Sequence, residues 1–544
     1  MLERRDSYDL LYHDFRWVIP SRFNIGTAVS DRWAAIEPDR TALLDYHAEG
    51  EPERLTFGEL AARSNAFARG LKRHGVRRGD RVALLLPQSF ETAIAHVAIY
   101  KLGAIAVPLA LLFGAEALRY RLGAAGVKAV VTTSAGVAKL RNIVGELRDL
   151  EQIVSINGAE AGADDFHRMI ADNPADHIAE DTGPDDPAMM IFTSGTTGQP
   201  KGALHGHRVL LGHLPGVQMH HEFLPQPGDR LWTPADWAWA GGLLNVLLPG
   251  LYFGVPVVVG RSEKFHPESA LLLAEKMAVR NAFIPPTALR MLRTVPDIGR
   301  RFKLSLRTIG SGGESLGRET FEWARAELGL AINEFYGQTE CNLVLSSMAV
   351  LGVSRPGAIG KPVPGHTAAV IDGEGRRLEA GEPGQIAIRR PDPVMFLEYW
   401  QNPEATAAKF IGEWMTTGDQ GTEDEDGYVH FFGRDDDVIT SAGFRIGPGE
   451  VEDCLTGHPS VALAAVVGKP DPLRTELVKA YVVLKPGTVG DRRLADEIRT
   501  WVRERLSAHE YPREIEFVED LPLTTTGKVI RRQLRERARR EGER

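Results

Sequence analysis

Short apolar segments alternate with helical segments in the first quarter of the sequence, and this alternation restricts the fold more than any other feature. Residues 81–86, 104–109 and 127–132 are short runs rich in Val, Ile, Leu and Ala, as expected of buried strands. The intervening residues 90–102 and 115–122 have helical patterns. Strands that are apolar throughout and separated by helices form parallel sheets covered on both faces. The sequence therefore predicts an α/β fold.

The first long helix carries a start and a stop signal. Thr56 and Glu59 form the capping-box pattern T-F-G-E, in which each side chain hydrogen-bonds the other residue's backbone N–H. Gly75 ends the pattern, because glycine is favoured just beyond a helix C-terminus. We expect a helix between them with Leu60, Phe67 and Leu71 facing inward.

A loop rich in glycine and hydroxyl residues follows the apolar strand 188–192. Its sequence, T-S-G-T-T-G-Q-P-K-G, leaves backbone N–H groups free to approach an anion, and Lys201 adds a positive charge. It is not a Walker A loop, because five residues separate Gly195 from Lys201 and Gly202 follows the lysine. We interpret it as a polyphosphate-binding loop rather than an ordinary turn. Its expected binding residues are Thr193, Ser194, Gly195, Thr196, Thr197, Gly198 and Lys201.

The composition excludes several classes of protein. A formal net charge of -9 gives no general attraction to nucleic acid or anionic lipid. Two cysteines exclude a disulfide framework and a cysteine-rich zinc site, and they suit a reducing cytosol. The longest apolar region, 243–260, is interrupted by Asn, Gly and Pro, so it cannot span a membrane. We expect a cytoplasmic protein with no nucleic-acid partner and no membrane span.

The character of the sequence changes after about residue 428. The run G-R-D-D-D-V-I at 433–439 is dense in charge, and a separate set of elements follows it. We expect strands at 461–467, 479–484 and 515–518 and a helix at 494–506. The basic run 531–540 is interrupted by a glutamate, which favours a solvated terminal helix over a docking patch. The predicted domains are residues 1–434, a hinge at 435–437 and residues 438–544.

Four further segments, far apart in the sequence, each fit part of a nucleotide. G-S-G-G-E at 310–314 is a glycine turn that can lie flat against a purine. E-F-Y-G-Q-T-E at 334–340 offers an aromatic ring, a hydroxyl and a carboxylate. W-M-T-T-G-D places Asp419 after a tight turn, and P-L-T-T-T-G-K places Lys528 at the tip of a loop. Each segment is weak evidence alone, since an Asp after Gly is usually a turn former.

Taken together and in this order along the chain, the motifs resemble those of the adenylate-forming acyl-CoA synthetase family. The resemblance extends from about residue 33 to residue 532. The acyl-CoA ligases, luciferases and peptide-synthetase adenylation domains are branches of this family. The resemblance implies a large N-terminal domain of helix-flanked sheets plus a barrel-like sheet, with a small mobile α+β C-terminal domain. It also implies two half-reactions. A carboxylate attacks the α-phosphorus of MgATP, giving an acyl adenylate and pyrophosphate; a thiolate, usually that of coenzyme A, then expels AMP.

The resemblance implies which residues perform this chemistry. Lys528 would bridge the carboxylate and the α-phosphate, because two anions meet only under compensating positive charge. Thr339 would contact the α-phosphate, and Glu340 with Thr193 would contribute to the Mg²⁺ site. Arg445, in S-A-G-F-R, would contact phosphate or AMP in the second half-reaction.

The resemblance also implies binding residues and a hinge. Asp419 and Arg434 would hold the ribose, Gly443 would line the tunnel for the coenzyme A thiol, and Asp436 matches the family hinge. Gly313 and Tyr336 would flank the adenine. The expected nucleotide contacts in these two segments are Gly313, Glu314, Glu334, Tyr336 and Gln338.

The residues that would line the acyl pocket are small. In short-chain members such as acetyl-CoA synthetase, a tryptophan closes the pocket at the position that matches Gly337. Trp239 matches a pocket tryptophan of the family and is followed by Ala240 and Gly241, while Gly312 precedes the G-E pair. We therefore expect an apolar slot larger than acetate requires. The nearest resemblance is to medium-chain acyl-CoA synthetases, with branched, aryl and short-chain acids as alternatives.

Other functions share the nucleotide motifs. An adenylation enzyme that loads a carrier protein and a luciferase-like oxidase would carry the same segments, whereas a non-catalytic AMP-binding sensor would not need Lys528. Cys341 departs from the Thr-Gly or Gly that often follows the T-E pair; a small buried residue is favoured over a reactive thiol, since nothing marks Cys341 as acidic.

A regulatory pattern overlaps the lysine. P-x-x-x-x-G-K at 522–528 resembles the recognition pattern of bacterial protein acetyltransferases that silence this family. A tight turn before a catalytic lysine explains the same residues. The regulatory interpretation predicts a lysine acetyltransferase and a deacetylase as partners at Lys528.

Overall fold

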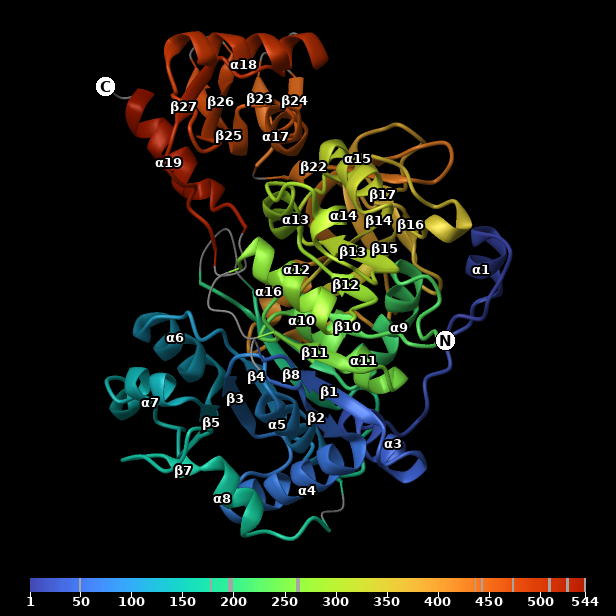
Figure 1. Cartoon of the computed structure of the whole chain (residues 1–544), viewed down its shortest axis with the longest axis vertical. Coiled ribbons are helices and arrows are strands. Elements are labelled where there is room, and N and C mark those ends of the chain that lie inside the picture. The colour runs from blue at the N-terminus through green and yellow to red at the C-terminus, as the bar shows by residue number, and fades with distance from the viewer. Residues whose placement is uncertain are drawn as a thin grey trace.

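Four β-sheets organise the chain in the computed structural model (Figure 1). The structure describes residues 1–47, 50–176, 179–193, 199–260, 265–435, 437–441, 444–471, 474–506, 510–524 and 528–542. The blue-to-teal segments that follow the first helix lie at one end of the molecule and the C-terminal sheet lies at the other, whereas the N-terminus lies between them, as the colours and labels of Figure 1 show. The predicted α/β fold, with a large N-terminal domain and a smaller C-terminal domain, is confirmed.

The first sheet has eight strands in the order β19-β9-β8-β4-β3-β5-β6-β7. Its centre is parallel, with β3 between β4 and β5, while β9 and β19 add antiparallel pairs at one edge. The three strands predicted from alternation are β3, β4 and β5. The strands are β3 (Arg81–Leu85), β4 (Ile105–Pro108), β5 (Val127–Thr132), β6 (Gln152–Ser155), β7 (Asp164–Asp165), β8 (Pro187–Phe192), β9 (Gly202–Gly206) and β19 (Glu398–Tyr399).

The second sheet has nine strands in the order β16-β15-β14-β13-β12-β10-β11-β1-β2. The strands from β14 to β1 run parallel, so their carboxyl ends lie along one edge. They are β1 (Thr41–Asp45), β2 (Glu53–Thr56), β10 (Leu231–Trp232), β11 (Val257–Val259), β12 (Asn281–Phe283), β13 (Thr308–Gly312), β14 (Ile332–Gln338), β15 (Cys341–Ser346) and β16 (Lys361–Pro362).

Helices cover these two sheets, and the predicted capping box begins the longest of them. Thr56 Oγ1 accepts from the Glu59 N–H at 3.2 Å, and Glu59 Oε2 accepts from the Thr56 N–H at 2.9 Å. The helices up to this part of the chain are α1 (Tyr8–Asp14), α2 (Ile25–Val29), α3 (Asp31–Ile36), α4 (Phe57–Arg73), α5 (Phe90–Lys101), α6 (Ala115–Ala125), α7 (Ser134–Leu140), α8 (Phe166–Ala171), α9 (Arg208–His220), α10 (Ala240–Gly242), α11 (Leu248–Phe253), α12 (Pro267–Lys276), α13 (Pro286–Leu292), α14 (Ile298–Arg301), α15 (Arg318–Glu327) and α16 (Pro403–Ala407).

Three short helices of other kinds complete this set. Val144–Glu146 and Ala349–Leu351 are 3₁₀ turns. Leu243–Leu247 is a π-helix between α10 and α11, in the apolar region that the sequence already excluded as a membrane span. Among the described residues, no helix combines the length and the apolarity needed to cross a membrane.

The third sheet is antiparallel, and the barrel-like shape expected of one N-terminal sheet stays a prediction. Its order is β17-β18-β21-β20, with β22 also paired to β21. The strands are β17 (Ala368–Ile371), β18 (Gly384–Arg389), β20 (Phe410–Ile411), β21 (Trp414–Glu423) and β22 (Val429–Arg434).

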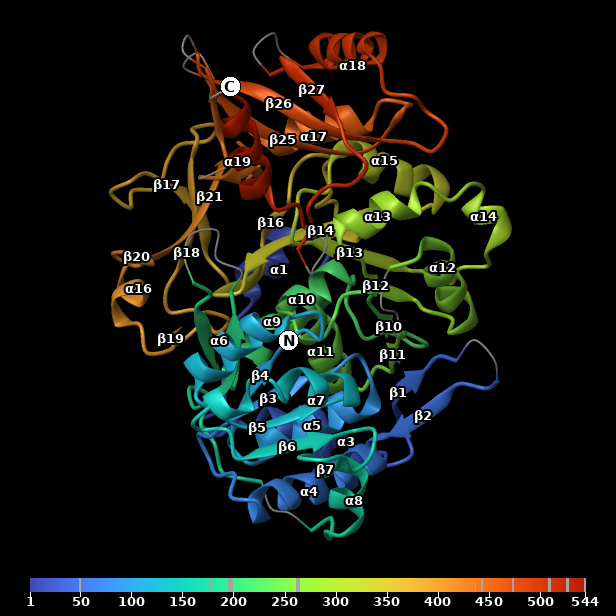
Figure 2. The same cartoon turned by 90° about the vertical axis from the view of Figure 1, so that its left-hand side faces the viewer.

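The fourth sheet and three helices form the C-terminal domain. Arg434 ends the third sheet and Ile439 begins the fourth, so the predicted boundary at 435–437 lies between two sheets. The four C-terminal elements predicted from sequence correspond to β25, β26, β27 and α18, and the basic run forms α19. The elements are β23 (Ile439–Ser441), β24 (Phe444–Ile446), β25 (Val461–Asp471), β26 (Thr475–Leu484), β27 (Glu514–Phe517), α17 (Pro448–Thr456), α18 (Arg492–Arg505) and α19 (Arg531–Gly542). Figure 2 shows the segment before α19 reaching down from this sheet toward the second one.

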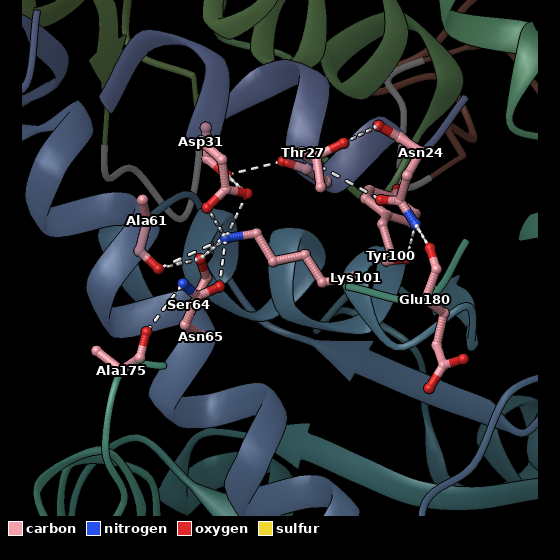
Figure 3. Close-up of polar contacts among 12 residues, drawn as sticks. Asn24, Thr27, Asp31, Ala61, Ser64, Asn65, Tyr100, Lys101, Ala175 and Glu180 are labelled. Atoms are coloured by element: carbon pink, nitrogen blue, oxygen red, sulfur yellow. Dashed lines mark hydrogen bonds and ion pairs between the residues drawn. The ribbon is translucent and has the colours of Figure 1, made fainter. Parts of the chain in front are cut away.

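A buried lysine ties helices α3, α4 and α5 together (Figure 3). Lys101 is fully buried at the end of α5, and its Nζ lies 2.9 Å from Asp31 Oδ2. The same ammonium donates to Asn65 Oδ1 at 2.7 Å and to Ser64 Oγ at 3.0 Å. Burial lowers the pKa of Lys101 and the Asp31 carboxylate opposes that shift. Because each of its three N–H donors has a partner, the buried charge is compensated.

Candidate active site

Asp419 lies at the centre of a polar group that joins the second and third sheets. Its Oδ2 accepts from the Tyr336 hydroxyl at 2.5 Å and from Gln338 Nε2 at 3.1 Å. Its Oδ1 faces Arg434 Nε at 3.9 Å, and the two residues stand opposite each other on β21 and β22. Burial raises the pKa of Asp419, while Tyr336 and Arg434 act to lower it. The structure thus brings together four of the predicted nucleotide residues.

The backbone at Asp419 differs from the sequence prediction. We expected a tight turn, but residues 414–423 form the continuous strand β21. Gly418 has φ +77°, a conformation that favours glycine, and the pairing with β18 shifts register here. The glycine therefore marks a bulge, which redirects the strand before Asp419 without ending it.

Lys409 belongs to the same group, although no sequence motif pointed to it. Its Nζ donates to Gln338 Oε1 at 3.0 Å and to the Thr416 carbonyl at 2.9 Å. Burial lowers the pKa of Lys409, and the carboxylates of Glu340 and Asp419 oppose this effect. Lys409 thus adds positive charge between the two predicted carboxylates.

Glu340 is held from the first sheet. It is only 7% exposed, and its Oε1 accepts a short hydrogen bond from the Tyr399 hydroxyl on β19. Lys201 Nζ, at the end of the predicted phosphate loop, lies 5.1 Å from the centroid of the Tyr399 ring. Thr193 Oγ1 accepts from the Lys201 N–H at 3.4 Å, which closes that loop at its base. Thr339 lies beside Glu340 in the turn between β14 and β15.

The glycine turn predicted at 310–314 is shorter in the structure, because it begins only after β13. Gly310 and Gly312 lie within β13, where a Cβ on either would come within 2.5 Å of His220 or Phe335. Only Gly313, at φ +97°, forms the turn. The first two glycines therefore permit close packing beneath the turn.

Glu314 and Glu334 fix the ends of the same loop. Glu314 forms an ion pair with Arg290 at 2.6 Å and accepts from the Thr287 hydroxyl at 2.8 Å. Glu334 Oε1 accepts from the Leu316 N–H at 3.2 Å. Burial raises the pKa of Glu334 to about 8. Both side chains therefore hold the loop at the carboxyl end of the second sheet.

Lys528 of the C-terminal domain reaches this loop. A Cβ built on Gly313 would lie 3.6 Å from Lys528 Cε and 3.7 Å from its Nζ. The Lys528 N–H donates to Thr524 Oγ1 at 3.0 Å, and Leu523 pairs with Val529 across the loop. Burial of the ammonium lowers the pKa of Lys528, opposed by Glu314 and Asp419. Because Lys528 as a whole residue is exposed, solvent weakens this effect.

The predicted acyl-pocket residues lie against aromatic side chains. A Cβ on Gly241 would come within 2.8 Å of Phe283, whose ring centroid is 5.3 Å from that of Phe335. The partly buried Trp239 ring makes an edge contact with Phe113 at 5.9 Å, and Ala240 packs beside it.

Gly337 is more constrained than the sequence suggested. A Cβ there would lie 2.2 Å from the Leu343 backbone nitrogen, so a tryptophan cannot be introduced at 337 without moving β15. The role of Gly337 as part of the acyl pocket stays a prediction.

Several predicted residues lie outside the described residues. They are Ser194, Gly195, Thr196, Thr197 and Gly198 of the phosphate loop, the hinge residue Asp436 and the tunnel residue Gly443. Arg445 lies on β24, where only its backbone is described.

Cys341 is fully buried on β15, and burial raises the pKa of its thiol well above the usual value. Such a thiol is not a nucleophile at neutral pH. The interpretation of Cys341 as a small buried residue is confirmed.

The arrangement suits a triphosphate with one bound divalent cation. The described residues contain no cluster of three or more His, Cys, Asp or Glu that could hold a metal by themselves. Mg²⁺ usually takes one or two carboxylates and completes its shell with phosphates and water, so the buried carboxylate of Glu340 fits it. Lys201, Lys409 and Lys528 approach the same region and would balance phosphate charge.

Comparisons with known proteins agree with this geometry. Residues 30–400 match the family described as AMP-binding enzyme, and residues 450–528 match the AMP-binding enzyme C-terminal domain. The chain is 34% identical to an acetyl-coenzyme A synthetase of Bacillus subtilis, over 97% of this chain and 94% of that protein. It is also 34% identical to the mitochondrial acyl-coenzyme A synthetase ACSM3 of Pongo abelii, over 98% and 92%.

A solved structure resembles the chain over almost its whole length. It is the crystal structure of the anthranilate CoA ligase AuaEII in complex with anthranoyl-AMP, with a TM-score of 0.90 and 30% sequence identity. The match covers 97% of this chain and 99% of that one.

Proposed function

The chain belongs to the AMP-binding enzyme family as an AMP-forming acyl-CoA synthetase, and we propose that it activates a medium-chain, branched or aryl carboxylic acid. The overall reaction consumes the acid, ATP and coenzyme A and releases the acyl thioester, AMP and pyrophosphate. The position of Lys528 beside Gly313 is the observation on which the proposed mechanism mainly rests. This position puts a positive charge from the C-terminal domain at the loop that would flank the bound nucleotide.

In the first half-reaction, a carboxylate oxygen attacks the α-phosphorus and the bond to pyrophosphate breaks. Lys528 holds the carboxylate beside the α-phosphate and offsets the charge that develops between them. Within the part of the chain that the structure describes, its Nζ has no hydrogen-bond partner, so its donors are available to substrate oxygens. Thr339 donates to the α-phosphate from the turn next to Glu340.

The nucleoside lies between the second and third sheets. The Asp419 carboxylate accepts from the ribose hydroxyls, with Arg434 opposite it on β22. The adenine lies between the backbone of Gly313 and the ring of Tyr336. Tyr336 also orients Asp419 through the 2.5 Å hydrogen bond, so one side chain serves both parts of the nucleoside.

The phosphates lie toward the first sheet. The loop from Thr193 to Lys201 surrounds them with backbone N–H groups and hydroxyls. Glu340 and Thr193 would hold a Mg²⁺ ion, which would supply positive charge to the polyphosphate. Tyr399 fixes the orientation of the Glu340 carboxylate through its hydroxyl.

In the second half-reaction, the thiolate of coenzyme A attacks the acyl carbonyl, and the bond to AMP breaks. We propose that the C-terminal domain rotates about Asp436, so that Lys528 moves away from the nucleotide site and β24 moves toward it. Gly443 then lines the thiol path, and Arg445 contacts the AMP phosphate. Gly443→Leu is expected to block thioester formation and leave pyrophosphate release intact, whereas unchanged overall turnover would remove Gly443 from the tunnel.

Aromatic surfaces support an acid larger than acetate. Phe283 lies against Gly241 and packs on Phe335, and Trp239 directly precedes Ala240. Aromatic surface therefore lies beside these small residues, and it suits an alkyl chain or an aryl ring. The resemblance to a ligase crystallised with anthranoyl-AMP agrees with an aryl acid. Each methylene buried in such a slot contributes about 0.8 kcal/mol, so the preference for chain length should be graded.

A screen of carboxylic acids for coenzyme A-dependent AMP release tests the substrate proposal. Medium-chain, branched or aryl acids should give the highest kcat/KM. A maximum at acetate or propionate would assign the enzyme to short-chain acids, and AMP release without a free thioester would indicate carrier loading. Ala240→Leu should narrow the slot and shift preference toward shorter acids, whereas an unaltered profile would remove Ala240 from the pocket.

We also propose that acetylation regulates the enzyme at Lys528. The residue is exposed on its loop, as a modifying enzyme requires, and acetylation removes the charge that the first half-reaction needs. This regulation implies a cytoplasmic location shared with the acetyltransferase and the deacetylase. Incubation with acetyl-CoA and a bacterial acetyltransferase should modify Lys528 and stop AMP release. Activity retained with Lys528 fully acetylated would contradict the mechanism, and no modification would contradict the regulation.

A further inference from the structure

We propose that Asp453 of the C-terminal domain is a positioning residue for the first half-reaction, because it caps helix α15 of the N-terminal domain and so keeps Lys528 at the nucleotide loop. This inference rests on the proposed function, since it concerns the placement of its catalytic lysine. Asp453 lies on α17, and α15 begins just after the loop that Lys528 contacts.

Helix α15 lacks a cap from its own domain. Its N-cap residue is Gly317, which has no side chain to satisfy the first backbone N–H groups. Asp453 Oδ2 accepts from the Arg318 N–H at 2.8 Å instead. A carboxylate at a helix N-terminus also interacts favourably with the helix dipole. The missing cap of one domain is thus supplied by the other.

Gly317 makes room for this contact. It has φ +82°, and a Cβ on it would lie 2.1 Å from Asp453 Oδ1. Any other residue at 317 would therefore be strained and would also displace the carboxylate. Beside it, a Cβ on Gly457 of the same C-terminal helix region would lie 3.1 Å from Glu319 Cδ. The two domains are therefore in close contact where the cap forms.

The cap and the lysine act on the two ends of one loop. Lys528 approaches Gly313 at the start of the loop, and Asp453 binds Arg318 at its end. The loop is anchored to β14 between them, because Glu334 accepts from the Leu316 N–H. The domain position that places Lys528 at the nucleotide therefore also forms the cap.

A salt bridge links the capping helix to the segment that carries the lysine. Glu452, next to Asp453 on α17, pairs with Arg531 at 2.6 Å, and Arg531 is three residues beyond Lys528. Arg535 of α19 pairs with Asp437 at 2.6 Å beside the hinge. Because this ion pair joins α17 to α19, the hydrogen bond that keeps α17 against α15 also keeps the Lys528 loop, which precedes α19, close to Gly313.

Asp453→Ala tests the proposal through the ratio of the two half-reactions. Removal of an N-cap costs enough to shift the domain equilibrium about fivefold. We expect acid-dependent ATP–pyrophosphate exchange to fall about fivefold, while thioester formation from supplied acyl adenylate is unchanged or faster. Asp453→Asn should retain most of the exchange activity, because the amide oxygen can accept from the Arg318 N–H.

Asp491→Ala is the matched control. Asp491 caps α18 by accepting from the Leu494 N–H at 2.8 Å, but both residues lie within the C-terminal domain. Its loss should lower thermal stability and leave the ratio of the half-reactions unchanged.

The outcomes separate this inference from the proposed function. Equal loss of both half-reactions in Asp453→Ala, or unchanged exchange, would overturn the positioning role. Loss of exchange in Asp453→Asn as large as in Asp453→Ala would overturn the capping explanation. If Lys528→Ala leaves pyrophosphate exchange intact in the same assay, the catalytic role proposed for Lys528 is contradicted, whatever the result for Asp453.

Discussion

Two lysines in different regions of the molecule show how the same side chain serves structure and chemistry. Lys101 is fully buried between α3, α4 and α5, and partners surround its ammonium (Figure 3). Lys528 stands on an exposed loop at the domain interface, and within the described part of the chain its ammonium donates to no such partner. Burial lowers the pKa of both lysines.

The difference lies in the unused hydrogen-bond donors. A lysine whose donors are all satisfied fixes the elements around it, and a substrate cannot recruit it without breaking those bonds. A lysine with free donors near anionic groups keeps its charge for a ligand. Glu314 and Asp419 act on Lys528 from a distance, as its pKa shows, and do not occupy its donors.

Lys528→Ala should have the largest effect on catalysis. We expect acyl-adenylate formation to fall on the order of 100-fold or more, which corresponds to about 2.7 kcal/mol of transition-state stabilisation. Thioester formation from supplied acyl adenylate and the thermal unfolding midpoint should hardly change. Pyrophosphate exchange and thioester formation, measured separately, test this. A loss shared equally by both would show that Lys528 is structural, like Lys101.

Lys101→Met should have the opposite profile. Loss of the ammonium leaves Asp31, Ser64 and Asn65 without their donor, at a cost of about 2 kcal/mol in the free energy of unfolding. Activity per folded molecule should stay unchanged. Lys72→Met is the control, because within the described residues the Lys72 ammonium forms a solvent-accessible pair with Glu180, and its loss should cost under about 1 kcal/mol. Equal shifts of the unfolding midpoint in both variants would contradict the structural role.

Local signals predicted the fold well where they act within one element. The capping box at Thr56 identified the start of α4, and the apolar run 127–132 matches β5 in both bounds. These features depend on a few neighbouring residues, so the sequence contains all the required information. The π-helix at Leu243–Leu247 had no comparable signal, because its backbone depends on packing against α9 and α11.

The sequence likewise identified those residues of the candidate site that lie within local motifs, and it missed those that only the fold brings to them. Motifs identified Tyr336, Asp419 and Arg434, and the structure brings them together. Lys409 and Tyr399 were missed, since they lie far from Gln338 and Glu340 in the sequence and no motif surrounds them. The turn expected before Asp419 is a bulge, because pairing with β18 and β22 keeps the strand continuous.

Asp236 is a partly buried acid, and no cation among the described residues compensates its charge. Burial raises the pKa of Asp236 to about 6, while the Ala238 N–H that donates to Oδ1 opposes the shift. A carboxyl whose folded pKa lies above the unfolded value stabilises the fold below about pH 4, and this contribution is lost as the pH rises to about 6.

Asp236→Asn keeps the acceptor for the Ala238 N–H and removes the charge. We expect the variant to match the wild type near pH 4 and to be more stable by on the order of 1 to 2 kcal/mol above pH 6. Unfolding midpoints from pH 4 to pH 8 measure this, with the exposed Asp39→Asn as control. A difference that is the same at every pH would rule out the titration of Asp236 as its cause.

Tyr336→Phe should have the smallest effect on activity of these variants. It tests whether the Tyr336 hydroxyl keeps the Asp419 carboxylate ionised for ribose binding. The hydroxyl donates to Asp419 Oδ2, so its loss removes one interaction that lowers the pKa of Asp419 against burial. Gln338 and Arg434 still interact with the carboxylate, so we expect ATP binding to weaken by only about 1 kcal/mol, which corresponds to a KM for ATP about fivefold higher. Because the pKa of Asp419 rises further in the variant, more of it is protonated at low pH, and the defect should be larger at pH 6 than at pH 8. Tyr428→Phe, which removes a hydrogen bond to the Gly352 carbonyl, is the control. A defect of the same size at both pH values would rule out the pKa of Asp419 as its cause, and no defect at all would mean that Tyr336 contributes through its ring alone, which phenylalanine keeps.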